Sequence, residues 1–221
     1  MKAKLVLLAF VALNLNAAHA ESNSMSFFVT SVGPGAGGDL GGLAGADAHC
    51  QKLAESAGAG KRTWHAYLST QASGFKDTSA QQARNRIGEG PWYNARGVLV
   101  ANNVEELHSA KSNLSKETAL DEKGRMVNGR TEKPNKHDML TGSRPDGTNF
   151  PPSPPFPDMT CGNWTKSGKE GSAMLGHHDL VGPNNDAWAT SWLSAHPSLG
   201  CDPESLNKTG GDGLFYCFAI D

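Results

Sequence analysis

Apolar side chains recur at helical spacing in one segment of the chain, which is its clearest predicted element. The positions repeat every three or four residues and form a single stripe, made of Ala46, Cys50, Leu53, Ala54 and Ala57. Gly58 follows and predicts the end of this helix. Two later pairs have capping-box spacing. Ser79 with Gln82 predicts a short helix that runs to residue 87, and Asn103 with Glu106 predicts one helical turn at "VEELH".

Aromatic and β-branched residues predict short strands in four places. These are "SFFVTSV" at 26–32, "TWHAYLST" at 63–70, the end of "GPWYNARGVLVA" at 90–101, and the aromatic run at 215–218. In the second of them Trp64, Ala66 and Leu68 alternate with other residues, as in a half-buried strand. The run at 215–218 predicts that the C-terminal segment is buried.

Between these elements lie two long stretches without a clear period. Large apolar residues are few from Ser109 to Asp158, and prolines crowd "NFPPSPPFPDM". So long a loop is unusual in a compact domain unless it is functional or disordered. We therefore predict an irregular, surface-lying segment of low local stability. A second loop is predicted from Asp179 to about Leu199.

The first twenty residues are typical of a secretory signal. "MKAKLVLLAFVALNLNAAHA" has two lysines, a short apolar stretch and a small-x-small ending, which predicts cleavage after Ala20 and one domain over 21–221. Removing Lys2 and Lys4 leaves 18 basic against 22 acidic residues, a formal charge near −4. This balance argues against nucleic-acid binding. The apolar stretch is too short to span a membrane, so we expect a periplasmic or secreted protein.

Four cysteines, Cys50, Cys161, Cys201 and Cys217, follow the predicted cleavage point. An even number in an exported chain predicts two disulfides, and three pairings are open. No Cys-x-x-Cys or close Cys/His pair has the spacing of a zinc motif.

Three stretches contain candidate chemistry. "GHHDL" places His177 and His178 beside Asp179, but neighbours in a strand point to opposite faces, so the two histidines do not easily bind one ion. "KHDMLTGSRPDGTN" has the oxygen-rich side chains that calcium uses, yet it lacks EF-hand spacing, and Pro-Asp-Gly also forms turns. Among the tryptophans, we predict Trp164 and Trp192 in the core and Trp188 exposed. No nucleophile elbow, His-Glu-x-x-His helix or phosphate loop appears.

The order of the cysteines resembles that of the C-type-lectin-like fold, and more closely its endostatin branch. "GADAHCQKLAESAGAGKRTWHAYLST", "TCGNWT" and "FYCF" carry the likeness, which spans 27–218. Bacterial secreted proteins described as lectin-like or endostatin-like are also similar. The resemblance implies an α+β fold with two short helices, a small antiparallel sheet and long irregular loops. It also implies disulfides Cys50–Cys217 and Cys161–Cys201, which by chain entropy are worth on the order of 5 and 4 kcal/mol.

The chain departs from the family's ligand motifs. Sugar-binding C-type lectins carry Glu-Pro-Asn or Gln-Pro-Asp and Trp-Asn-Asp, whereas this chain has "RPD" at 144–146 and "NNDAW" at 184–188. The resemblance therefore does not imply sugar binding through calcium. Endostatin's zinc site in an N-terminal histidine segment is not implied either, because "ESNSMSFF" has no histidine.

These observations predict a non-catalytic binding module that recognises a carbohydrate or an extracellular protein through its long loops, without a cofactor and with little contribution from calcium. The candidate ligand-binding residues are Asp138, Asp146, Asn149, Asn184, Asn185, Asp186 and Trp188. One alternative is a metal-dependent hydrolase that uses His137, His177, His178 and nearby aspartates, and clustering of these side chains would favour it. A structural envelope protein is the other alternative.

Overall fold

The computed structural model describes residues 24–221, so the predicted signal peptide and its cleavage point lie outside the described residues. In chain order the elements are β1 (Phe27–Val29), α1 (Gly42–Ser56), β2 (Trp64–Ala66), the 3₁₀ helix η1 (Ala83–Asn85), β3 (Trp92–Tyr93), β4 (Leu99–Ala101), α2 (Val104–Leu107), β5 (Asp138–Leu140), α3 (Cys161–Trp164), β6 (Met174–His177), β7 (His196–Pro197), α4 (Pro203–Thr209) and β8 (Gly211–Ala219). The mixed helix and strand content is confirmed. In the described range four helices replace the two that were expected.

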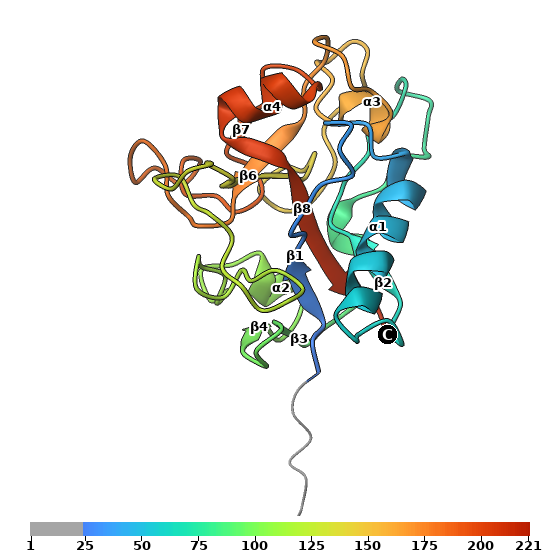
Figure 1. Cartoon of the computed structure of the whole chain (residues 1–221). Coiled ribbons are helices and arrows are strands. Elements are labelled where there is room, and N and C mark those ends of the chain that lie inside the picture. Colours follow the sequence, from blue (N-terminus) through green and yellow to red (C-terminus); the bar gives the residue numbers. More distant parts are fainter. Residues whose placement is uncertain (1–23) are drawn as a thin grey trace, which may run out of the picture.

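The C-terminal strand β8 is the centre of the main sheet (Figure 1). The strand order is β1-β8-β5-β6-β7, and β2 also pairs with β8. All pairs are antiparallel except β5 with β8, which is parallel. The sheet is therefore mixed rather than antiparallel as expected, because β5 enters it beside β8 in the same direction. Strands β3 and β4 form a separate hairpin.

Both faces of β8 are covered by apolar side chains. Phe215, Cys217 and Ala219 belong to one core cluster, which includes the buried stripe of α1. Leu214, Tyr216 and Phe218 belong to the other core cluster. This alternation follows from the period of two in a strand, and it confirms that the C-terminal aromatic run is buried.

Two disulfides join distant parts of this core. Cys50–Cys217 links α1 to β8 across a sequence separation of 167, and Cys161–Cys201 spans 40 residues. This is the pairing that the resemblance implies. Four residues of the predicted stripe, Ala46, Cys50, Leu53 and Ala54, are buried in α1, whereas Ala57 is its exposed C-cap. Gly58 follows at φ +80°. In this left-handed conformation glycine is favoured.

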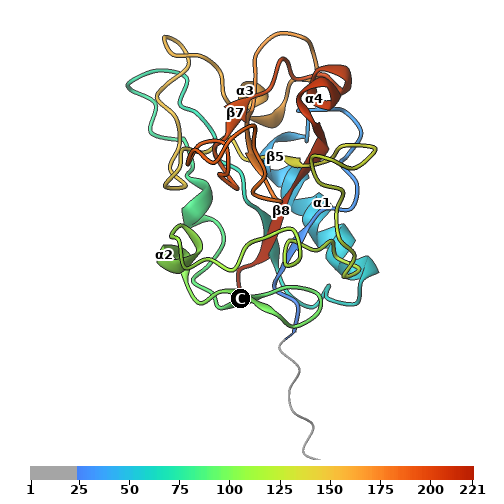
Figure 2. The same ribbon diagram turned by 90° about the vertical axis from the view of Figure 1, so that its left-hand side faces the viewer.

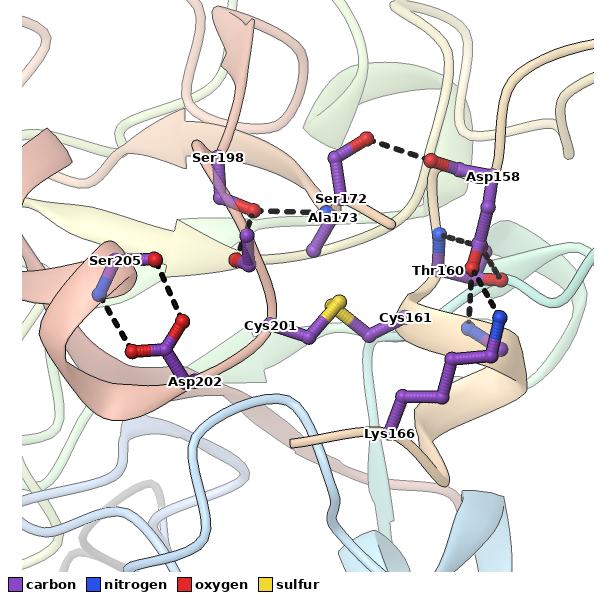
Figure 3. The surroundings of a disulfide bond; sticks show 12 residues. Asp158, Thr160, Cys161, Lys166, Ser172, Ala173, Ser198, Cys201, Asp202 and Ser205 are labelled. Atoms are coloured by element: carbon purple, nitrogen blue, oxygen red, sulfur yellow. Dashed lines mark hydrogen bonds and ion pairs between the residues drawn. A yellow bond between two sulfur atoms is a disulfide. The ribbon is translucent and has the colours of Figure 1, made fainter. Parts of the chain in front are cut away.

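The second disulfide connects two capped turns (Figure 3). Thr160, next to Cys161, accepts a hydrogen bond from the amide of Asn163, and Asp202, next to Cys201, caps α4. The four residues of α3 all have positive φ, between 48° and 66°, so this turn is left-handed. Such a conformation costs roughly 1–2 kcal/mol per non-glycine residue. The disulfide and the hydrogen bond from the Gly162 amide to Asp158 hold the turn in place.

Three predicted segments differ from the structure. The helix expected over 79–87 is only η1, because the Ser79 hydroxyl bonds to Asp77 instead of capping a helix. The segment 109–158 is mostly irregular, as predicted, but residues 137–143 are buried and contain the interior strand β5. Helix α4 was not predicted, although Asp202, Pro203 and Gly210 are standard boundary residues. Within residues 24–221 we find no helix with the length and apolar character needed to cross a membrane.

Candidate metal centre

Three neighbouring strands bring histidine and aspartate side chains together at one end of the main sheet. In the antiparallel register Asp138 of β5 lies directly opposite His177 of β6. His196 of β7 lies opposite Leu175, two residues before His177, and therefore on the same face. His137 comes immediately before β5. Figures 1 and 2 show that these strands occupy the half of the molecule that also contains α3 and α4.

Three imidazole nitrogens converge on one carboxylate oxygen. The Nε2 atoms of His137, His177 and His196 lie 3.0, 3.4 and 3.7 Å from Oδ1 of Asp138. The Nε2 atoms of His177 and His196 are 3.1 Å apart. The rings of His137 and His177 stack with their centroids 4.2 Å apart. We call these four residues the His–Asp cluster.

On the other side of each ring, Nδ1 contacts an oxygen atom that only accepts hydrogen bonds. These contacts are His177 to the carbonyl of Ala189 at 2.7 Å, His196 to the carbonyl of Pro197 at 3.2 Å, and His137 to Oδ1 of Asp179 at 3.4 Å. A ring hydrogen on Nδ1 satisfies each of these contacts, and a neutral histidine in that tautomer keeps its lone pair on Nε2. Metal-binding histidines in proteins have the same arrangement.

In this tautomer, and with Asp138 ionised, the inward-facing atoms have no hydrogen atom to share among them. Both carboxylate oxygens of Asp138 are buried without a hydrogen-bond partner. Three lone pairs and a carboxylate repel one another unless a proton or a cation lies between them. Ligand atoms around a tetrahedral zinc ion lie about 3.3 Å apart, given zinc–ligand distances of about 2.0 Å. Four of the separations within the cluster, from 3.0 to 3.7 Å, bracket this value.

The type of donor favours a transition metal. Imidazole nitrogen suits zinc, copper, iron and nickel, whereas calcium prefers six to eight oxygen atoms. The compact group that could hold a metal ion is His137, Asp138 and His177, whose ligand atoms lie within 4.8 Å of one another. His196 lies outside this compact group, with its Nε2 atom 3.7 Å from Oδ1 of Asp138 and 3.1 Å from Nε2 of His177.

Burial controls access and protonation at the cluster. The side chains of His137, Asp138 and His177 are almost fully buried, whereas that of His196 is 30 % exposed. Burial raises the pKa of Asp138 to about 7, against the opposing effect of His137. Burial, with the nearby His137, lowers the pKa of His177 to about 4. Both shifts follow from the cost of placing a charge in this buried site.

Asp179 contacts the cluster behind the His137 ring. Its Oδ1 atom faces His137, and its Oδ2 atom accepts a hydrogen bond from the amide of Arg130 at 2.8 Å. Burial acts to raise the pKa of Asp179, but the hydrogen bonds from His137 and from the amides of Arg130 and Val181 outweigh it and lower the pKa to about 2. Asp179 is therefore an ionised carboxylate that orients the His137 ring.

The two adjacent histidines of "GHHDL" separate as the strand period predicts. His177 points into the cluster, whereas Nε2 of His178 contacts the carbonyl of Asn128 at 3.1 Å. Of the group named for the alternative hydrolase, His137 and His177 therefore come together with Asp138, and His178 does not join them. His196 was missed, because nothing in "SAHPS" marks a ligand.

The predicted ligand-binding residues fall into three surroundings. Asp138 is buried in β5 rather than on a loop face. Asp146 is exposed, and its Oδ1 atom accepts hydrogen bonds from the amide and hydroxyl of Thr148, as in an ordinary turn. Asn149, in the same turn region, is half-buried. The structure thus separates Asp138 from the other two by burial.

The segment 184–188 is exposed and holds itself together. Oδ2 of Asp186 accepts hydrogen bonds from the side-chain amide of Asn184 at 2.9 Å and from Nε1 of Trp188 at 3.2 Å. Asn185 is exposed. Trp188 is 47 % exposed, whereas Trp164 and Trp192 are buried. The predicted core positions of Trp164 and Trp192 and the predicted exposure of Trp188 are confirmed.

Two cavities are lined by residues outside the cluster. They have volumes of about 620 and 670 Å³ and are lined mainly by residues of the segments 43–47, 81–89 and 103–105, with His65 and Ile220. Neither is lined by a residue of the His–Asp cluster. No protein-family model matches this chain, and no curated protein matches it.

Proposed function

We propose that this protein binds a transition metal of the zinc type through His137, Asp138, His177 and His196. One observation carries the proposal. Three Nε2 lone pairs, fixed by acceptors behind their rings, face a buried carboxylate that has no hydrogen-bond donor. Such a set is stable when a cation is bound between its members.

The centre is structural rather than catalytic in this proposal. Structural zinc sites have four protein ligands, and catalytic sites keep one position open for water. Here four donors are available and three are buried, so solvent reaches the centre only beside His196. The cavities of about 620 and 670 Å³ are lined by other residues. The alternative of a metal-dependent hydrolase is therefore less well supported than a non-catalytic metal-binding domain.

The adjacent histidines provide a matched pair of variants for the test. His177 and His178 are both fully buried, yet only His177 faces the cluster. Zinc binding to the chelator-treated protein should show one site per chain by calorimetry. His177→Gln should lose that site, and His178→Gln should keep it. Equal zinc stoichiometry in both variants would refute the assignment of His177 as a ligand.

We also propose carbohydrate binding at the exposed segment around Trp188. The support is the fixed ring of Trp188, whose N–H is already bonded to Asp186, so that mainly its apolar surface is left for a ligand. Sugar rings stack on such surfaces while neighbouring amides bond to their hydroxyl groups. Glycan-array binding by the wild type that is lost in Trp188→Ala would support this role. Recognition of an extracellular protein stays a prediction.

We further propose that the protein is exported to an oxidising compartment and that it is related to C-type-lectin-like domains. Two disulfides in one chain are typical of periplasmic or secreted proteins. The connection from first helix to last strand supports the proposed relationship. Calcium has no part in the proposal, because Asp138 lies among nitrogen donors and Asp146 is used in a turn.

A further inference from the structure

The exposed segment Val181–Trp188 is fixed at both ends by residues that contact the His–Asp cluster. Asp179 precedes it and bonds to His137 through Oδ1. Ala189 follows it, is fully buried, and accepts a hydrogen bond from His177 at 2.7 Å. Between these two ends, Leu180 and Gly182 are partly buried and all other residues are exposed.

The same oxygen atoms also contact the segment itself. Oδ1 of Asp179 accepts a hydrogen bond from the amide of Val181 at 3.2 Å. Gly182 lies directly against Ala189, because a Cβ atom at Gly182 would be 2.3 Å from the Ala189 carbonyl oxygen and 2.5 Å from its Cβ. The two ends of the segment therefore touch each other beside the carbonyl that orients His177.

We infer that metal binding at the His–Asp cluster and the conformation of the segment 181–188 are thermodynamically coupled, so that the metal controls how Trp188 is presented. This inference rests on the proposed metal centre. An imidazole that gives its Nε2 lone pair to a cation becomes a stronger donor at Nδ1. Coordination by His137 and His177 therefore strengthens the hydrogen bonds to Asp179 and Ala189, which hold the two ends of the segment.

Coupling of this kind is reciprocal. If metal binding stabilises one conformation of the segment, a change that disfavours this conformation must weaken metal binding by the same factor. Coupling factors of about 5 to 150 are typical between sites in proteins. A substitution in the segment that touches no ligand therefore tests the inference.

Gly182→Ala is that substitution, and Gly74→Ala is its matched control. Both glycines are partly exposed, lie in irregular segments and lack positive φ. The added methyl group collides with the Ala189 carbonyl in the first variant, whereas no atom lies within 4 Å in the second. Zinc titration should show affinity at least about fivefold weaker for Gly182→Ala. Gly74→Ala should bind zinc as the wild type does. Circular dichroism of both metal-free variants establishes that they are folded.

Hydrogen exchange of the wild type supplies a second measurement that needs no variant. Amides of 181–188 should exchange at least about fivefold more slowly with zinc than with chelator. The exposed loop around Phe75 should not change. Unaltered exchange in 181–188 despite bound zinc, or wild-type affinity in Gly182→Ala, would overturn the coupling and leave the metal centre intact. A wild-type protein that binds no zinc would instead refute the proposed function.

Discussion

Both carboxylate oxygens of Asp138 are buried without a donor, and the nitrogens that face them are acceptors. An amide at this position would donate a hydrogen bond to one of those nitrogens and would remove the buried charge. We therefore expect Asp138→Asn to keep or raise the free energy of unfolding of the metal-free protein, by up to about 1 kcal/mol. The same variant should bind zinc about a hundredfold more weakly or worse.

Urea denaturation in the presence of chelator and zinc titration check these two effects. Asp146→Asn, at an exposed turn position outside the segment 181–188, serves as the control and should leave zinc binding unchanged. A metal-free Asp138→Asn protein that is less stable than the wild type by more than about 1 kcal/mol would show that the carboxylate already has a stabilising partner.

Zinc affinity should also depend on pH in a defined window. Because the pKa of Asp138 is raised to about 7, its carboxyl group holds a proton below that pH, and zinc must displace it. His177, with a pKa near 4, is already neutral there. We expect the apparent affinity to fall by about fiftyfold in total from pH 7 to pH 5, approaching tenfold per pH unit at the acid end. Calorimetry at pH 7.5, 6.5 and 5.5 measures it, and a flat profile would exclude Asp138 as a ligand.

At the residue scale, the period of two correctly separates His177 from His178. The same argument does not predict that His137, Asp138 and His196 lie next to His177, because cross-strand neighbours depend on sheet order and register. The sequence-based expectation of no metal rejected a site at the adjacent pair, and only the alternative hydrolase combined His137 with His177. The partners of His177 lie about 20 to 40 residues away in the chain.

Among the elements, helix α4 and its C-terminal glycine position one ligand. Gly210 has φ +117°, and a Cβ atom there would be 2.9 Å from Cδ2 and 3.0 Å from Nε2 of His137. Gly58 also follows a helix at positive φ, but no atom lies within 4 Å of its Cβ position. A substitution at Gly58 therefore introduces backbone strain alone, whereas one at Gly210 adds a collision with His137.

We expect Gly58→Ala to lower the free energy of unfolding by about 1 kcal/mol and to leave zinc affinity unchanged. Gly210→Ala should lower the free energy of unfolding by more than this amount. It should also weaken zinc binding, because the methyl group displaces the His137 ring. Urea denaturation and zinc titration of both variants measure the difference. Equal effects of the two substitutions would show that the His137 ring adjusts without loss.

Elements with a continuous local pattern were predictable from the sequence, and those defined by distant partners were not. Helix α1 has a repeating stripe, and α2 has the Asn103 cap. Strand β5 has three residues, too few for a period, and owes its place to β6 and β8. The predicted helix over 79–87 failed because Asp77 binds the hydroxyl groups of both Ser73 and Ser79. This local competition favours a turn over a cap.

On the scale of the whole molecule, the covalent links and the proposed metal connect different sets of elements. Cys50–Cys217 ties α1 to β8, and Cys161–Cys201 ties α3 to the start of α4. The His–Asp cluster spans β5, β6 and β7, which lie on one side of β8 in the sheet. The strands farthest from the first disulfide would therefore depend most on the metal.

Metal binding should consequently raise the stability of the entire domain. A ligand that binds only the folded state at a free concentration of a hundred times its dissociation constant adds about 2.7 kcal/mol. For a domain of this size this corresponds to a rise in Tm of roughly 5–11 °C. His178→Gln should show the same rise from its own lower starting point, and His177→Gln should show none. Differential scanning calorimetry with zinc and with chelator measures these shifts. An equal rise in the His177→Gln protein would mean that zinc stabilises the domain from another site.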